Sequence, residues 1–152
     1  MAADRSYVTK NREQLERLRM LVDRLSDQEL AKPMEAGWTV ASVLAHLAFW
    51  DYRVVTLLDR WKASGTPPPP IDERHVDWIN DAGKPLCLAL PPRVAARTAM
   101  EAAVAADDRV AALTEAQLEA NAKAGSPISV LRAEHRREHL DEIEHALAGR
   151  KA

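Results

Sequence analysis

The sequence lacks several features that define large classes of proteins. Its 152 residues include a single cysteine, Cys87, so no disulfide can form within the chain, as is typical of a reducing cytoplasm. The formal net charge is −2, which argues against general nucleic-acid binding because that rests on an excess of lysine and arginine. Residues 1–6 hold no apolar run, and the most apolar segment, residues 40–50, is too short to span a bilayer. We therefore expect a cytoplasmic protein with no nucleic-acid or membrane partner.

Strand-forming segments are also nearly absent. Residues 86–90 are the one short apolar run between the expected helices, and a single run cannot build a sheet. The 5 glycines and 9 prolines leave four long stretches with neither residue in their interiors. Because the length is also close to that of one ordinary domain, we predict a single all-α domain over residues 1–152.

Apolar residues recur at steps of three and four within these stretches, which predicts amphipathic helices. The expected helices cover about residues 4–27, 38–64, 92–118 and 127–148. Gly65 is expected to end the second helix, and Ser126 with Pro127 to begin the fourth.

The connections predict the order of the helices. The first and last loops are short, so each joins antiparallel neighbours. Residues 65–91 form a much longer crossover, with extended prolines at 67–70 and a short extra helix at 75–80. Because such a crossover can traverse the whole bundle, we predict a four-helix bundle in which the second and third helices run parallel, in up-down-down-up order.

Three of the 5 histidines lie on apolar helix faces. Residues at steps of four share one ridge of the last helix: Leu131, His135, His139, Ile143 and Leu147. His46 lies in the apolar part of the second helix. Buried imidazoles need partners, and two of them about 6 Å apart on one helical turn can share a metal ion. We predict a divalent metal site on His46, His135 and His139.

Such a site suits catalysis better than structural support. Three neutral imidazole ligands leave at least one position for water or substrate, and the ion keeps its full charge, which favours bound hydroxide or thiolate. Imidazole accepts zinc, nickel, cobalt or iron, so the ligands leave the metal open. Asp51 and Glu142 are the candidates for orienting the histidine rings.

Two other interpretations of the last helix stay open. In the first, the bundle binds no metal, and the histidines are packing and surface residues. Arg136, Arg137 and Glu138 then form a solvated face, and Arg132 extends a basic patch. Residues 135–139 also spell HxxEH, the inverted zinc-peptidase pattern, in which the glutamate activates water. Such peptidases are normally much larger and need a further carboxylate ligand.

Four residues are candidates for lining a pocket. Trp50 lies one helical turn from His46, where it lines a pocket or packs in the core. His75, Asp77 and Asn80 lie in the crossover, where they form either a lid near the metal or a solvated helical turn whose apolar neighbours pack inwards. We favour the solvated turn.

Two segments resemble the DinB-like family of four-helix-bundle metalloproteins. They are residues 37–50, GWTVASVLAHLAFW, and residues 134–143, EHRREHLDEI. The family pattern has a histidine in an apolar, tryptophan-rich second helix and an HxxxH pair in the last helix, and His46, His135 and His139 match it. The helix number, the crossover and the length also agree, so the resemblance covers nearly the whole chain.

The resemblance implies a monomeric or homodimeric bundle whose three-histidine site holds zinc or nickel. Better understood members, including YfiT-like metal-dependent hydrolases and thiol S-transferases, use thiols such as bacillithiol, mycothiol or glutathione. The implied function is a metal-dependent thiol S-transferase or isomerase, in which the ion activates a low-molecular-weight thiol or water towards a small-molecule electrophile. The alternative is a non-catalytic binding or stress-protection protein with the same metal site.

Overall fold

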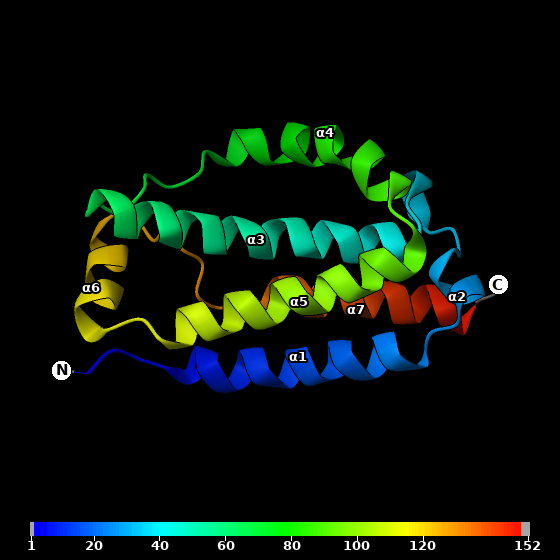
Figure 1. The fold of residues 1–152 in the computed structure, drawn as a ribbon, viewed down its shortest axis with the longest axis horizontal. Helices are drawn as coiled ribbons and strands as arrows, with labels where there is room; N and C mark the ends of the chain where they lie inside the picture. Colours follow the sequence, from blue (N-terminus) through cyan, green and yellow to red (C-terminus); the bar gives the residue numbers. More distant parts are fainter. Residues whose placement is uncertain (1, 150–152) are drawn as a thin grey trace.

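A computed structural model describes residues 2–149, and the long regular elements in that range are helices (Figure 1). Four of them are long: α1 (Ser6–Arg24), α3 (Val40–Ser64), α5 (Pro92–Ala111) and α7 (Ala133–Ala148). The shorter helices are α2 (Asp27–Leu30), α4 (Val76–Ala89) and α6 (Glu115–Lys123), with 3-10 turns η1 (Glu35–Gly37) and η2 (Glu73–His75). The prediction of an all-α fold is therefore confirmed.

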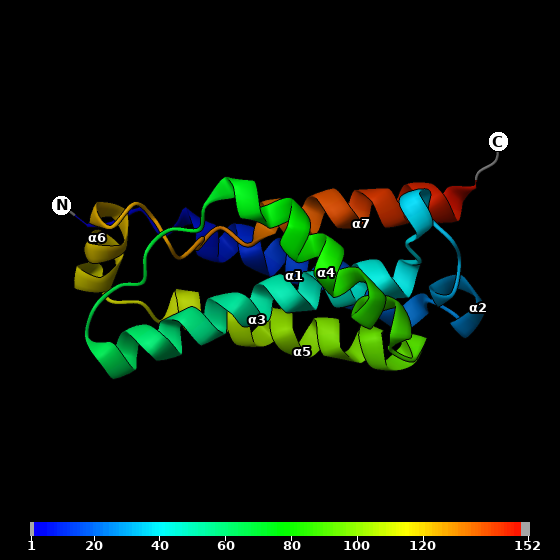
Figure 2. The ribbon, with the colours of Figure 1, turned by 90° about the horizontal axis from the view of Figure 1, so that it is seen from above.

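The long helices lie side by side along one axis. In Figure 1, α1 and α7 run towards one end of the molecule, whereas α3 and α5 run towards the other. α4 lies outside this group and crosses α3 obliquely, as the view from above shows (Figure 2). Among the described residues, no helix is both long enough and apolar enough to cross a membrane.

α3 is the most buried helix, and its ends are fixed by local hydrogen bonds. At its start, the Thr39 side chain accepts from the Ser42 amide, and the Ser42 hydroxyl accepts from the Thr39 amide. At its end, Gly65 adopts a left-handed conformation with φ of 77° and donates its amide to the Trp61 carbonyl. The predicted cap at Gly65 is confirmed.

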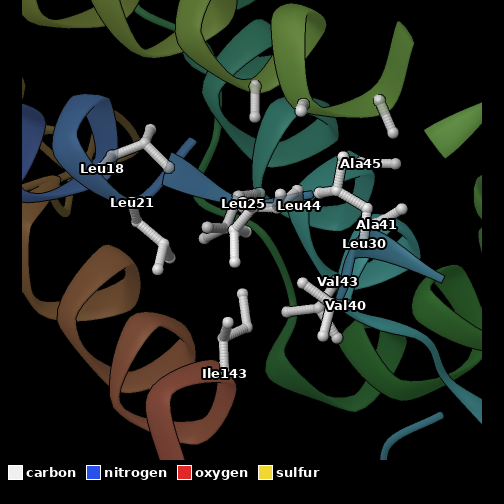
Figure 3. Packing of buried hydrophobic residues seen from close by; sticks show 14 of the residues in the cluster. Leu18, Leu21, Leu25, Leu30, Val40, Ala41, Val43, Leu44, Ala45 and Ile143 are labelled. Carbon is white, nitrogen blue, oxygen red and sulfur yellow. The ribbon is translucent and has the colours of Figure 1, made fainter. Parts of the chain in front are cut away.

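The core lies between the four long helices, with α5 packed against α3 and α1, and α7 packed against the same two helices. Leu18 and Leu21 of α1, Leu44 of α3 and Ile143 of α7 are almost fully buried in one cluster (Figure 3). α5 adds a face of small residues: Ala95, Ala96, Ala99, Ala102, Ala103 and Ala106. These side chains let α5 approach α3 closely, so the inner face of α5 is its alanine face.

The third and fourth predicted helices are wrong in their bounds. The predicted helix 92–118 breaks after Ala111, because Thr114 and Gln117 form a capping box that starts α6. The last helix begins at Ala133 and not at Pro127, and Ser126 has a positive φ of 56°. The Asn121 side chain instead bonds both the amide and the carbonyl of Ile128, at 2.9 Å each, which holds residues 126–132 in an irregular path.

The crossover is more helical than predicted. α4 spans 14 residues, so it extends well past the expected turn at 75–80 and includes most of the apolar run 86–90. None of its residues is fully buried. The prediction that this run lies outside the helices is wrong, because it continues α4, whose half-buried residues recur at steps of three and four and form the face that meets α3.

Candidate metal centre

The structure brings the three predicted histidines together between α3 and α7. His46, His135 and His139 each offer a ring nitrogen, and these atoms all lie within 4.8 Å of one another. The Nε2 atoms of His135 and His139 are 3.2 Å apart. The His46 ring centroid lies 5.2 Å from that of His135 and 4.8 Å from that of His139.

Burial keeps two of the rings neutral. Burial, reinforced by His139, lowers the pKa of His46 to about 4. Burial also lowers the pKa of His135 to about 3, with His139, His46 and two nearby arginines acting in the same direction. Both rings are therefore neutral at pH 7 and have a lone pair free for coordination.

The spacing of these nitrogens fits a metal ion. Zinc–nitrogen bonds of 2.0–2.1 Å in tetrahedral geometry place two ligand nitrogens about 3.3 Å apart. The distance of 3.2 Å between the Nε2 atoms on α7 agrees with this value. Imidazole ligands suit zinc, nickel and cobalt alike. The three histidines are positioned to hold a divalent ion.

His139 has a partner that fixes its tautomer. Its Nδ1 lies 2.6 Å from Glu142 Oε1. Because an ionised carboxylate can only accept, Nδ1 carries the proton, and the Nε2 lone pair faces His135. The prediction of Glu142 as an orienting group is confirmed by this contact. Trp38 adds an edge-on contact to His46, with ring centroids 5.7 Å apart.

The other predicted orienting group, Asp51, is engaged elsewhere. Its carboxylate lies 2.9 Å from Arg132 Nε and 3.5 Å from an Arg136 guanidinium nitrogen. Arg136 also forms a bidentate pair with Asp107, at 3.0 Å to each oxygen. We call Asp51, Asp107, Arg132 and Arg136 the buried ionic cluster, because it joins α3, α5 and α7 and is largely shielded from water.

The predicted placement of Arg136 on a solvated face is therefore wrong. Arg136 is 1% exposed and Arg132 is 7% exposed, so the basic patch does not exist as a surface. Arg137 and Glu138 are exposed as predicted. The difference arises because acidic partners on α3 and α5, distant in the sequence, offset the charges of Arg132 and Arg136.

The pocket candidates separate into two pairs. Trp50 and Asn80 meet, because the Trp50 indole donates to Asn80 Oδ1 at 2.8 Å and so ties α3 to α4. His75 and Asp77 are exposed. The expected inward packing of their apolar neighbours is wrong for Trp78, which is 57% exposed and donates its indole N–H to His75 Nδ1.

The sequence analysis missed two further links between α4 and the metal centre. Lys84 donates to the Ala36 carbonyl, and its ammonium lies 5.4 Å from the centre of the Trp38 ring. Lys84 lies one turn after Asn80, so both residues occupy the face of α4 that meets α3. Two surface hollows lie elsewhere, beside Trp61 and beside the proline run, and neither is lined by the histidines.

The sequence model of the DinB superfamily matches residues 11–143, a span that includes all three histidines. The chain belongs to the DinB superfamily. No curated protein and no solved structure matches it significantly. The resemblance seen in residues 37–50 and 134–143 is therefore confirmed at the level of the superfamily, which indicates a fold and does not name a substrate.

Two other reactive groups of this DinB-superfamily protein lie outside the centre. Cys87 is partly buried, and burial raises the pKa of its thiol, so the neutral thiol predominates at pH 7. Glu138 is exposed, and within residues 2–149 no carboxylate joins the histidine cluster as a ligand. The described part of the chain therefore does not supply the carboxylate ligand expected of an inverted zinc peptidase.

Proposed function

We propose that this DinB-superfamily protein binds zinc or nickel on His46, His135 and His139 and acts as a metal-dependent thiol S-transferase or isomerase. The observation that carries the proposal is the convergence of three ring nitrogens within 4.8 Å, two of them on rings that stay neutral at pH 7. When bound, a divalent ion would supply the positive charge that lowers the pKa of a coordinated thiol from its usual value of about 8.5.

The residues of the chain supply binding and orientation. Glu142 holds the Nδ1 proton of His139, so the Nε2 lone pair is directed at the centre. Trp38, which precedes α3, makes an edge-on contact with His46, and Trp50 follows His46 by one turn of α3, where Asn80 fixes its ring. His139 retains 21% side-chain exposure, which leaves a path for a small thiol and a small-molecule electrophile.

The proposed reaction balances without a redox partner. The thiol loses its proton to water, and its sulfur forms a bond to an electrophilic carbon. In a substitution, the bond to the leaving group breaks and the leaving group departs with that electron pair. In an addition to a carbon–carbon double bond, the π electrons move to the neighbouring carbon, which takes a proton from water. Water in place of the thiol would make the protein a hydrolase. The same site without turnover would make it a binding or stress-protection protein that sequesters a reactive compound.

We propose an up-down-down-up bundle that acts in the cytoplasm on small molecules, as a monomer or a homodimer. The opposite directions of the two pairs of long helices in Figure 1 support the order of the bundle. The single cysteine supports a reducing compartment.

The first test is the metal content of the untagged protein, purified without added metal or chelator. We expect a single zinc or nickel ion per chain, lost in His139→Ala and retained in His145→Ala. His145 is exposed and is no part of the histidine cluster, so it is the matched control. Full metal binding by His139→Ala would contradict the site.

The second test measures thiol-dependent loss of a model electrophile by the metal-loaded and metal-free proteins. Turnover that needs both the metal and a thiol supports the transferase. Metal binding with no turnover across glutathione, mycothiol and bacillithiol would instead support the binding protein.

A further inference from the structure

Arg53 of α3 is a partly buried cation without an acidic partner. Its guanidinium carbon lies 5.6 Å from the centre of the Trp50 ring, so it stacks over the indole. No carboxylate within residues 2–149 forms an ion pair with it. Burial, and then repulsion by Arg132, lowers the pKa of Arg53, although the group stays charged at neutral pH. An arginine in such surroundings is stabilised by any anion that reaches it.

The neighbouring acidic groups are already neutralised. In the buried ionic cluster, the two carboxylates of Asp51 and Asp107 balance the two guanidinium groups of Arg132 and Arg136. Arg53 therefore adds an uncompensated positive charge beside the cluster. Leaving a partly desolvated charge unpaired costs free energy, which a ligand carboxylate would recover.

Arg53 also lies in register with the metal centre. His46, Trp50 and Arg53 follow at steps of four and three, so they share one face of α3. The Cα atoms of His46 and Arg53 are about 10 Å apart along the helix axis, given a rise of 1.5 Å per residue. Side chains on a helix lean towards its N-terminus, which directs Arg53 over Trp50 and towards His46.

The surface on which Arg53 rests is held in place. The Trp50 indole donates its N–H to Asn80 on α4, which fixes the ring under the guanidinium. The stack leaves the edge of the guanidinium, with its N–H groups, free for a planar anion. A carboxylate accepts two such bonds in parallel, which a neutral amide or alcohol cannot do.

We propose that Arg53 is a specificity-determining residue that binds the carboxylate of the thiol ligand, whose thiol end is held at the three-histidine centre. This inference rests on the proposed function and names its substrate class, a low-molecular-weight thiol that bears a carboxylate. Three observations support that chemistry: the positive charge of Arg53 that no carboxylate pairs, its stack on Trp50, and the face of α3 that it shares with His46.

The test uses the cobalt-loaded full chain and a series of ω-mercapto acids of increasing length, each paired with its primary amide. Binding is read from the cobalt–thiolate charge-transfer band, which needs no turnover. We expect one chain length at which the acid binds roughly tenfold more tightly than its amide. Arg53→Gln should abolish that preference and leave amide binding unchanged, and Arg53→Lys should restore only part of it, because lysine lacks the planar fork.

Arg60→Gln is the matched control, because Arg60 is an exposed arginine two turns further along α3. It should bind every ligand as the unsubstituted protein does. If acids and amides bind equally at every length, or if Arg53→Gln keeps the preference, the inference is overturned while the proposed function stands. If cobalt is not bound, or no thiol produces the band, the proposed function fails, and the inference fails with it.

Discussion

Replacing Arg136 with methionine should destabilise the protein more than any change on the outer face of α7. Arg136 is 1% exposed, and it donates to both oxygens of Asp107 and to the Asn11 carbonyl. Methionine fills much of the volume but offers no donor. The substitution therefore leaves the Asp107 carboxylate without its partner inside the protein and removes the bond that the Asn11 carbonyl accepts in addition to its helical one.

The size of the effect follows from what is left behind. The Asp107 side chain is only 11% exposed, and burial already raises the pKa of this group against the opposing effect of Arg136. Removing one partner of a buried ion pair costs about 3–5 kcal/mol. Asp51 loses less, because its 2.9 Å bond to Arg132 remains. We expect a loss of about 3–5 kcal/mol in the free energy of unfolding at pH 7.

Urea unfolding followed by circular dichroism measures this loss. Arg137→Met is the control, since Arg137 is exposed and its ion pair with Asp141 at 3.7 Å should contribute less than about 1 kcal/mol. The deficit of Arg136→Met should shrink as the pH falls from 7 to 5, because protonation neutralises Asp107. A loss below about 1 kcal/mol, or a deficit that grows on acidification, would refute the reasoning.

Three further predictions concern the metal centre and α4. Between pH 7 and pH 5, the metal-free protein should lose about 2 kcal/mol of unfolding free energy for each of the two buried rings, His46 and His135. The unfolded chain protonates these rings below about pH 6.5, whereas in the folded protein they stay neutral. Urea midpoints that do not fall across this pH range would contradict the prediction. Glu142→Gln should weaken zinc binding about tenfold, because glutamine keeps an acceptor for His139 but loses the negative charge. Competition with a chromophoric chelator measures the affinity. An unchanged affinity would show that Glu142 is not part of the site. Asn80→Ala should speed amide hydrogen exchange in α4 without changing exchange in α5. α4 has no fully buried residue, and the Trp50–Asn80 hydrogen bond ties it to α3. Equal exchange rates in the variant and the unsubstituted protein would mean that other contacts hold α4.

The parts of the fold that the sequence predicts well are those with local causes. The spacing of four between His135 and His139 places them on one ridge whatever surrounds the helix. Gly65 ends α3 because glycine adopts the left-handed conformation without strain. His46 lies beside them because the apolar faces of α3 and α7 are buried in the same core.

The break between α5 and α6 had a readable signal that alanine obscured. Thr114 and Gln117 have the spacing of a capping box, which marks a helix start. The surrounding alanines favour helix so strongly that the sequence predicts one continuous helix over 92–118. The capping side chains prevail because they satisfy backbone donors that a helix terminus leaves unpaired.

Other errors had no local signal. The start of α7 depends on Asn11, whose side chain accepts from the Ala133 amide across 122 residues of sequence. Arg136 is buried because Asp51 and Asp107, on two other helices, happen to meet it. Long-range polar contacts of this kind cannot be inferred from periodicity, since a charged residue between two histidines is more often solvated.

The buried ionic cluster and the metal centre occupy adjacent faces of the same helix. Arg136 follows His135 by one residue, which is a rotation of about 100° around α7. The cluster therefore fixes how far α7 is turned, and that rotation decides whether His135 and His139 face His46. We expect the double variant Arg136→Met/Asp107→Asn to regain much of the lost stability, because no charge is then left unpaired at Asp107.

Stability and metal affinity should then separate. If the cluster orients α7, the double variant should refold cooperatively yet bind zinc at least about tenfold more weakly than the unsubstituted protein, since small displacements of metal ligands are costly. Calorimetry of zinc binding, beside urea unfolding of the same samples, gives both quantities. Recovery of stability together with full zinc affinity would show that packing of the apolar ridge alone sets the rotation of α7, and that the buried charges contribute nothing to the geometry of the centre.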